Sequence, residues 1–561
     1  MAASRPSTEV DVVVVGAGLA GLVATAQLLK AGRSVALLDQ ESTRHLGGQA
    51  WWSLGGLFLV DSPEQRRMGI ADSSELAWSD WQGSAGFDRL AGEQDQDCWG
   101  QRWAKAYVEW AAGEKRSWLR KHGLSFFPVV GWAERGDGNA EGHGNSVPRF
   151  HVVWGTGPGI VGPFEEAVRA GVASGAVRLL GRHKVRELIV TDGTVTGVRG
   201  DILATDEAER GAASSRGVVG EFDIAAQAVI VASGGIGGNH ELVRQFWPSR
   251  LGEPPQEMLT GVPAYVDGSM LAIAGEAGGQ LVNRDRMWHY TEGLTNHSPV
   301  WAGHGIRVLA GPSGLWLDAN GTRLPAPNFP GFDTLGTLAH LRGTGHDHSW
   351  MVLTNSILGK EWTLSGSEQN PDLTGRSVPG VLGRVRNDLP EPVKAFLDAG
   401  VDLVSGNSVA ELASKMNSLT DEPLIDRRRL QATIAARDAQ LGNPFGKDAQ
   451  LSAIRGAREY RGDRLVRTAK LHRFSDRHHG PLVAARLRVL TRKTLGGLQT
   501  DLRSRVRSAQ GQAIPGLYAA GEIAGFGGGG VHGYRSLEGT FLGGCLYTGR
   551  SAGRAVAQDL A

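Results

Sequence analysis

The stretch from Val10 to Asp39 constrains the fold more than any other part of this sequence. It begins with a valine-rich run and continues with Gly16-Ala-Gly-Leu-Ala-Gly21 and an apolar-periodic run, Leu22–Leu29. A second apolar segment then ends at Asp39. This pattern predicts a buried strand, a glycine turn, a helix and a second strand, which together form one βαβ unit.

The glycines of this unit predict a ligand as well as a turn. Gly16 allows the tight turn after the strand, Gly18 lets the backbone approach a pyrophosphate, and Gly21 lets the helix pack closely on the strand. The helix N-terminus supplies unpaired N–H groups and the positive end of a dipole to the phosphates. Asp39 closes the second strand, where an acid can accept hydrogen bonds from ribose hydroxyls. We therefore predict a dinucleotide site.

Length and composition exclude several classes of protein. At 561 residues the chain is expected to form two or three domains. Its 59 basic and 58 acidic residues balance, so no overall field attracts nucleic acid or an anionic membrane. No run approaches the roughly 20 apolar residues that span a bilayer, and the N-terminus has no signal-peptide core. Two cysteines, Cys98 and Cys545, fit a reducing compartment and provide neither a metal cluster nor a disulfide framework. A cytoplasmic protein is expected.

A second glycine loop, His45-Leu-Gly47-Gly48-Gln49-Ala50, follows the βαβ unit. It resembles the Gly-Gly loop of the flavoprotein superfamily that includes succinate dehydrogenase, fumarate reductase and 3-ketosteroid dehydrogenase. The resemblance implies that the βαβ unit binds the ADP half of FAD and that the second loop runs along the pyrophosphate and the flavin. Apart from His45, the loop has no candidate histidine for covalent flavin attachment, so FAD is expected to be non-covalent.

Two later segments extend the resemblance. The run from Ala228 to Gly235 resembles the family's second adenine-side strand, and Pro515–Glu522 resembles the last strand of its FAD domain, whose acid would bind ribityl or ribose hydroxyls. The family's final helix points its N-terminus at the flavin pyrimidine, and here it would begin near Thr540. The residues expected to bind FAD are Gly16, Ala17, Gly18, Ala20, Gly21, Asp39, Gln40, Gly47, Gly48, Gln49, Ala232, Ser233, Gly234, Gly521, Glu522 and Thr540.

The resemblance also implies the architecture, an α/β fold with two parts. A Rossmann-like FAD-binding domain, which contains a β-meander, would comprise residues 1–283 and 494–561. An inserted α+β capping domain would comprise residues 284–493. Within the first segment, Ala104–Leu119 predicts one amphipathic helix. The many tryptophans of residues 57–150 predict aromatic core packing, and lining an apolar substrate channel is the alternative role for some of them.

The candidate catalytic residues are Tyr534, His289, Tyr290 and Arg535. Tyr534 stands six residues before Thr540, as does the tyrosine of the Tyr-Pro-Gly-Pro-Gly-x-Thr stretch in 3-ketosteroid dehydrogenases. That likeness implies that it holds a ketone, although Glu538 replaces the second glycine of the stretch. His289 and Tyr290 stand where the family has a His-Pro-Thr element facing the substrate, and they are candidates for the base, with Tyr107 as a third candidate. A tyrosine base needs its pKa of about 10 lowered by cations such as Arg535 or Lys493.

We therefore expect a dehydrogenase that transfers hydride between flavin N5 and a carbon β to a ketone, and that desaturates a 3-ketosteroid-like apolar substrate. An ene reductase of the fumarate-reductase type is the first alternative, because Arg535 lies one position from that branch's carboxylate-binding arginine. Leu358 stands where that branch has its acid-donating arginine. A flavin-binding protein without turnover is the second alternative. No haem or iron–sulfur motif is present, so a diffusible electron acceptor is expected; oligomeric state and exact substrate are left open.

Overall fold

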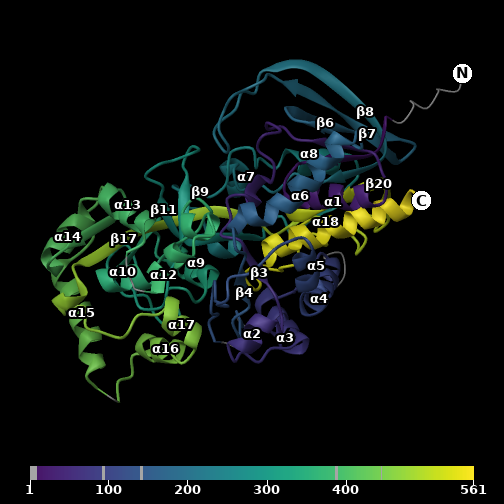
Figure 1. The fold of residues 1–561 in the computed structure, drawn as a ribbon. Helices are drawn as coiled ribbons and strands as arrows, with labels where there is room; N and C mark the ends of the chain where they lie inside the picture. Colours follow the sequence, from purple (N-terminus) through teal and green to yellow (C-terminus); the bar gives the residue numbers. More distant parts are fainter. Residues whose placement is uncertain (1–8, 91–94, 139–142, 386–388, 444) are drawn as a thin grey trace, which may run out of the picture.

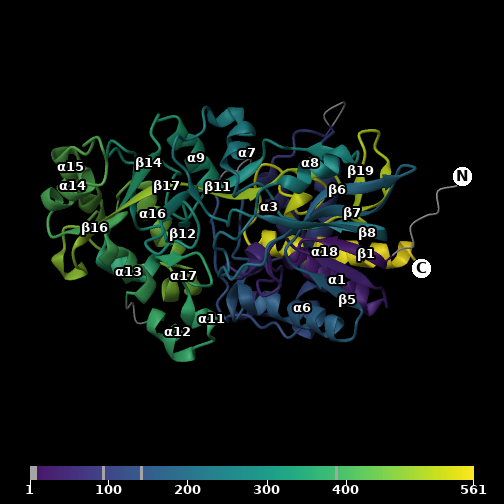
Figure 2. The ribbon, with the colours of Figure 1, turned by 90° about the horizontal axis from the view of Figure 1, so that it is seen from above.

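The computed structural model describes residues 9–90, 95–138, 143–385, 389–443 and 445–561. Two bodies lie side by side, and each is built on a β-sheet (Figure 1, Figure 2). One body combines the beginning and the end of the chain, and the other is formed by its middle. In the part of the chain that the structure describes, none of the helices has the length and the apolar character that a membrane span requires.

The first body contains the sheet that the βαβ pattern predicts. Its strands follow the order β19-β20-β8-β1-β2-β5, and β7 pairs with both β8 and β6. The bounds are β1 Val10–Val15, β2 Val35–Leu38, β5 Val177–Leu180, β6 His183–Thr191, β7 Thr194–Leu203, β8 Val218–Val231, β19 Arg505–Arg507 and β20 Ala513–Ala519. Strands β1, β2, β5, β8 and β20 are mutually parallel, as a Rossmann-like sheet requires, and β6–β8 form the antiparallel meander.

Strand β1 shows why a run of valines fits this position. Val12 and Val14 lie in one hydrophobic cluster, and Val13 and Val15 lie in another. Because successive side chains of a strand point to opposite faces, a strand covered on both sides must be apolar at every position. The predicted buried strand is therefore confirmed.

Helices α1, Leu19–Lys30, and α18, Thr540–Asp559, pack against each other along their length in the first body (Figure 1). Glycines make this close contact possible, since a Cβ on Gly549 would lie 2.4 Å from the Ala20 carbonyl oxygen. A Cβ on Gly553 would lie 2.6 Å from the Ala24 carbonyl oxygen. The predicted start of the last helix at Thr540 is confirmed.

The first body contains further helices and two small strand pairs. They are α2 Pro63–Arg67, α3 Ser74–Ala85, α4 Cys98–Ala112, α5 Lys115–Lys121, α6 Thr156–Ala173, α7 His240–Gln245, α8 Ser269–Glu276, and the strand pairs β3 Gly56–Phe58 with β4 Phe150–Val152 and β10 Leu281–Val282 with β18 Gly497–Leu498. The prediction of one helix over Ala104–Leu119 was wrong, because α4 ends before Gly113 and α5 begins at Lys115.

The second body is built on a sheet in the order β13-β14-β17-β11-β12-β15, to which β9 and β16 add by pairing with β17. Its strands are β9 Leu259–Thr260, β11 Met287–Thr295, β12 Gly305–Leu309, β13 Leu315–Leu317, β14 His348–Thr354, β15 Thr363–Leu364, β16 Leu403–Gly406 and β17 Leu482–Thr494. Its helices are α9 Thr334–Arg342, α10 Asn355–Glu361, α11 Pro371–Thr374, α12 Val378–Val385, α13 Glu391–Ala399, α14 Val409–Asn417, α15 Arg427–Leu441, α16 Ala449–Ala457 and α17 Arg461–Val466.

The two sheets draw on different parts of the sequence. The strands of the first sheet lie within residues 10–231 and 505–519, and those of the second within 259–494. Strand β17 is the long central strand of the second sheet, and its last residues point toward the first body (Figure 2). The domain boundaries at 283/284 and 493/494 stay predictions.

Candidate functional site

One large cavity lies between the two bodies. Its walls include the glycine turn of the βαβ unit, the second glycine loop, the ends of β2 and β8, and the start of α18. The second body contributes Tyr290 from β11, Arg307 and Leu309 from β12, Ser365, and Arg492 and Lys493 from β17. Because the carboxyl ends of β1, β2 and β8 meet here, the cavity lies where ligands bind in open parallel sheets.

The two glycines of the turn, Gly16 and Gly18, have different surroundings. Gly16 has φ +104°, and a Cβ there would lie 2.6 Å from the Ala232 carbonyl oxygen. Gly18 differs, because a Cβ there would meet no atom within 4 Å, and its backbone lines the cavity. Gly18 therefore keeps a space open at the N-terminus of α1, where N–H groups bind phosphate. This open cradle fits a dinucleotide.

Asp39 lies at the cavity end of β2, and both of its carboxylate oxygens are held by the backbone. Its Oδ2 accepts from the Ala17 N–H at 2.8 Å and its Oδ1 from the Glu41 N–H at 2.8 Å. Burial raises the pKa of Asp39 above its usual value, against the opposing effect of these N–H donors. The remaining lone pairs of the carboxylate can accept hydrogen bonds from ribose hydroxyls.

Farther along the cavity, Glu522 connects the two bodies. Its Oε1 accepts from the Thr494 N–H at 2.9 Å, and its Oε2 accepts from Gln49 Nε2 at 2.8 Å. Lys493 lies beside this pair, with Nζ 3.4 Å from Gln49 Oε1. Burial lowers the pKa of Lys493 below its usual value. The start of α18 completes this wall, since Gly539 and Phe541 also line the cavity.

Most residues predicted to bind FAD line this cavity, and three do not. Ala17 donates its N–H to Asp39, and a Cβ on Gly21 would lie 1.9 Å from the Gly16 carbonyl oxygen. Thr540 Oγ1 donates to the Leu537 carbonyl at 2.6 Å and contacts His532 Nε2 at 2.8 Å. Each of the three has these contacts within the protein and lies outside the cavity lining. The roles of all the predicted residues toward FAD stay predictions.

The cavity lining also contains a set of apolar residues and a polar corner. Leu54, Phe150, Leu309 and Ala133 supply the apolar surface, and no tryptophan is among the described residues that line it. The polar corner contains Tyr290, Arg307 and Glu538. Such a site suits a ligand that is apolar over most of its surface and has one polar group.

Arg307 lies at the centre of the polar corner and contacts three carboxylates. It pairs with Glu134 at 2.7 Å, with Glu538 at 2.7 Å and with Glu292 at 3.8 Å. Its guanidinium carbon also lies 3.6 Å from the centre of the Tyr290 ring. The Tyr290 hydroxyl donates to Glu538 Oε1 at 3.4 Å, and burial raises the pKa of Tyr290 well above its usual value.

Tyr534 does not line the cavity. Its hydroxyl donates to Asp88 Oδ2 at 2.9 Å, and its ring faces the guanidinium groups of Arg286 at 4.2 Å, Arg250 at 5.0 Å and Arg89 at 5.9 Å. Its predicted contact with a ketone would require a substrate that reaches outside the cavity lining. That role stays a prediction without support from the geometry.

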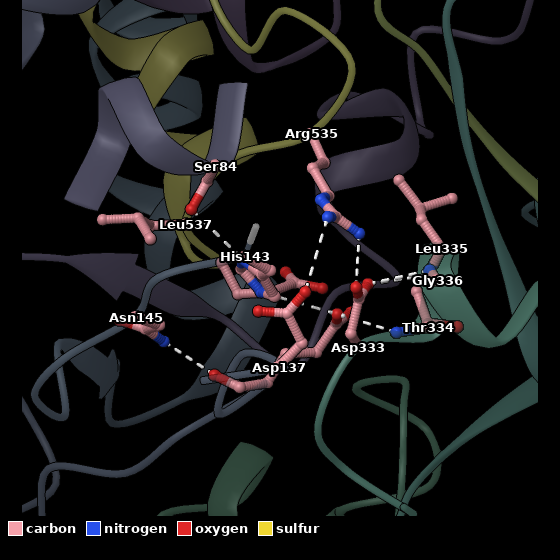
Figure 3. A network of polar contacts seen from close by, with 12 residues as sticks. Ser84, Asp137, His143, Asn145, Asp333, Thr334, Leu335, Gly336, Arg535 and Leu537 are labelled. Atoms are coloured by element: carbon pink, nitrogen blue, oxygen red, sulfur yellow. Dashed lines mark hydrogen bonds and ion pairs between the residues drawn. The ribbon is translucent and has the colours of Figure 1, made fainter. Parts of the chain in front are cut away.

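His289 and Arg535 also lie outside the cavity lining. His289 stacks on Trp247, and its Nδ1 accepts the Arg492 N–H at 3.1 Å. Burial lowers the pKa of His289 to about 3, so the ring stays neutral near pH 7. Arg535 points at Asp333, its ion-pair partner at the N-terminus of α9 (Figure 3). Both residues have structural partners that account for their positions.

Sequence reasoning missed Arg307, Glu134 and Glu292. No motif includes them: Glu134 lies between α5 and β4 of the first body, Glu292 in β11 and Arg307 in β12 of the second. The basic run Arg486–Lys493 gave a partial signal for two further cations of the cavity, Arg492 and Lys493. Arg486 and Arg488 both pair with Asp402, whereas Arg492 and Lys493 reach the cavity.

Known proteins resemble this chain in sequence and in fold. Residues 11–542 match the family described as FAD binding domain. A KsdD-like steroid dehydrogenase of Mycolicibacterium smegmatis is 59% identical over 553 residues, which cover 99% of this chain and 100% of that protein.

Two solved structures of ketosteroid dehydrogenases have the same fold. The 3-ketosteroid-delta4-(5alpha)-dehydrogenase of Rhodococcus jostii, in complex with 4-androstene-3,17-dione, has a TM-score of 0.60 at 20% identity and covers 99% of this chain and 98% of its own. The 3-ketosteroid delta1-dehydrogenase of Sterolibacterium denitrificans, in complex with 1,4-androstadiene-3,17-dione, has a TM-score of 0.63 at 16% identity and covers 98% and 99%.

Proposed function

This chain belongs to the FAD binding domain family, and we propose that it is an FAD-dependent dehydrogenase that desaturates an apolar ketone of the 3-ketosteroid class. Its relative at 59% identity is described as a KsdD-like steroid dehydrogenase. The observation on which we rest the proposal is the cavity itself, in which a dinucleotide cradle continues into an apolar chamber with one polar corner.

The chamber fits the two parts of such a substrate. Leu54, Phe150 and Leu309 offer flat apolar contact to a fused-ring body. A ketone is the polar end, and its place is the corner formed by Tyr290, Arg307 and Glu538. Bound FAD would be held by the Gly18 turn and Asp39, and it would supply the acceptor for a hydride at N5.

The chain's own residues supply the acid–base part of the reaction. Tyr290 is the phenol of the polar corner, and we propose that it removes the proton from the carbon next to the ketone. Its hydroxyl donates to Glu538, and a phenol oxygen that donates one hydrogen bond can still accept a proton. General base catalysis of this kind contributes about 10²- to 10⁴-fold in rate. The electrons then leave to a diffusible acceptor.

The reductase alternative has less support from the geometry. Arg535, which it would use to bind a carboxylate, is paired with Asp333 outside the cavity lining. Leu358, at the position of the acid-donating arginine, is fully buried in the core of the second body. Arg492 and Lys493 are cavity-lining cations that could still attract a carboxylate.

The test is anaerobic mixing of the flavin-loaded protein with 4-androstene-3,17-dione, followed by visible absorbance. We expect bleaching of the flavin band, slowed about 10²-fold or more in Tyr290→Phe. Tyr518→Phe is the matched control, because the Tyr518 hydroxyl donates to Asp559 at 2.6 Å and Tyr518 does not line the cavity. It should bleach like the unmodified protein.

Two other results would redirect the assignment. Bleaching that survives in Tyr290→Phe and is lost in Tyr534→Phe would move the ketone contact to Tyr534. No bleaching by the steroid, with rapid reoxidation of the dithionite-reduced protein by fumarate, would contradict the dehydrogenase proposal and favour the reductase.

A further inference from the structure

We propose that Glu538, Arg307 and Glu134 form a buried proton relay behind Tyr290, in which Glu538 takes the phenolic proton of Tyr290 as Tyr290 takes a proton from the substrate. This inference rests on the proposed dehydrogenase function and names the group that makes Tyr290 able to act as a base. The parts of the relay come from both bodies, so it exists only in the folded protein.

Hydrogen bonds link Tyr290 through Glu538 and Arg307 to Glu134, and His143 lies beyond Glu134. The Tyr290 hydroxyl reaches Glu538 Oε1 at 3.4 Å, the same oxygen accepts from Arg307 at 2.7 Å, and the other arm of Arg307 donates to Glu134 at 2.7 Å. Glu134 lies 3.7 Å from His143 Nε2, a nitrogen that has no hydrogen-bond partner among the described residues. His143 in turn contacts Ser84 Oγ through Nδ1 at 3.2 Å (Figure 3).

The cluster is buried and holds more acid than base. Glu134, Glu292 and Glu538 have exposed fractions of 1%, 3% and 8%, and Arg307 has 5%. Three ionised carboxylates around one guanidinium would leave a net charge of about −2 away from water, which burial strongly disfavours. Burial and the neighbouring acids, Asp333 among them, raise the pKa of Glu134 well above its usual value. The cluster therefore retains at least one proton near neutral pH.

Hydrogen bonds keep the acids of the cluster in place. Glu134 Oε2 accepts from the Thr334 N–H at 3.1 Å, and Glu292 Oε2 accepts from Thr334 Oγ1 at 2.7 Å. Thr334 is the first residue of α9, so its N–H is one of the free donors at that helix end. Arg307 is positioned to pair with the carboxylates of the cluster that are ionised.

The relay solves a problem that Tyr290 alone would have. Because burial raises the pKa of Tyr290, a free tyrosinate would be rare in this corner. In the relay, the substrate C–H bond breaks and its proton forms a new O–H bond on Tyr290. The old phenolic O–H bond breaks at the same time, and its proton forms an O–H bond on Glu538. Tyr290 remains neutral throughout, and one negative charge of the cluster is neutralised.

Glu538→Gln is the first test, because glutamine keeps the shape but cannot take the proton. We expect kcat for the steroid to fall about 10²-fold or more with KM changed less than about threefold. Glu538→Asp should recover part of the loss. Glu361→Gln is the matched control, since Glu361 is a buried carboxyl bonded to Ser313 and Ala469 outside the cavity lining. A kcat of Glu538→Gln within about twofold of this control would overturn the relay.

Infrared spectroscopy of the protein without substrate tests the stored proton separately. The difference spectrum between the unmodified protein and Glu134→Gln at pH 7 should show loss of a carboxylic-acid C=O band, whereas loss of only an ionised carboxylate band would contradict the inference. An unmodified protein that shows this band but never bleaches with steroid would contradict the proposed function and leave the stored proton standing. Steroid turnover by a protein that lacks this band would support the proposed function and contradict the stored proton.

Discussion

Gly18 and Gly21 belong to one motif, yet their surroundings give them different tasks. A Cβ on Gly21 would collide with the Gly16 carbonyl oxygen at 1.9 Å, whereas a Cβ on Gly18 would meet no atom within 4 Å. Gly18 also has φ −71° and ψ 177°, a conformation that any residue adopts. At the scale of single residues, Gly21 is therefore required by the fold, whereas we propose that the open space at Gly18 serves the ligand.

This difference predicts that substitution of Gly18 weakens FAD binding, whereas substitution of Gly21 lowers the stability of the protein. Gly18→Ala should leave the free energy of unfolding of the flavin-free protein within about 0.5 kcal/mol and weaken FAD binding by roughly tenfold or more. Gly21→Ala should destabilise the flavin-free protein itself by about 1–3 kcal/mol. Thermal unfolding and fluorescence titration with FAD measure the two effects. Equal FAD affinity in Gly18→Ala would show that the pyrophosphate does not approach this turn.

At the scale of elements, the glycine contacts between α1 and α18 set how both helices meet the cavity. Each helix begins at it, since Gly18 and Leu19 of one and Gly539 and Phe541 of the other line its wall. Helix N-termini favour negative charge, so this pairing directs two such ends at one ligand. The close approach depends on Gly549 and Gly553, because a side chain at either position would collide with the α1 backbone.

We expect Gly553→Ala to destabilise the protein by about 1–3 kcal/mol, because the new Cβ would lie 2.6 Å from the Ala24 carbonyl oxygen and push the helices apart. Gly456→Ala is the matched control, a helical glycine in α16 with nothing within 4 Å. It should be neutral or stabilise by about 0.5–1 kcal/mol. Thermal unfolding measures both, and equal melting temperatures would contradict the tight helix contact.

At the scale of the whole molecule, the cavity walls come from both bodies, so a ligand that fills the cavity bridges them. Gln49 and Glu522 of the first body meet Lys493 and Thr494 of the second at the centre of this wall. A cofactor can bind there only when the protein is folded, because the unfolded chain has no such cavity. Its binding free energy therefore adds directly to the stability of the native state.

The melting temperature should accordingly rise with FAD concentration. FAD at 100 times its dissociation constant should add about 2.7 kcal/mol to the free energy of unfolding of the deflavinated protein. Riboflavin at the same concentration is the control ligand and should add much less, because it lacks the part that Gly18 and Asp39 would hold. A melting temperature independent of FAD, or equal effects of both ligands, would contradict this arrangement of the cofactor.

The sequence by itself determined the dinucleotide half of the site, because that half depends on local spacing. Strand, glycine turn, helix and Asp39 follow one another within a single βαβ unit, and the parallel strands bring their ends to one edge. The resemblance to the flavoprotein family, rather than local spacing, predicted Glu522 and the start of α18. Local spacing failed for Ala104–Leu119, where the apolar period continues across Gly113 although the helix does not.

Only the tertiary structure decided which side chains form the polar corner. Tyr534, His289 and Arg535 stand in recognisable motifs, yet each is held by partners outside the cavity lining. Arg307, Glu134, Glu292 and Glu538 are remote from one another in the sequence, and they meet because the two bodies pack together. Local pattern cannot encode such a meeting, since it depends on how the second sheet lies against the first.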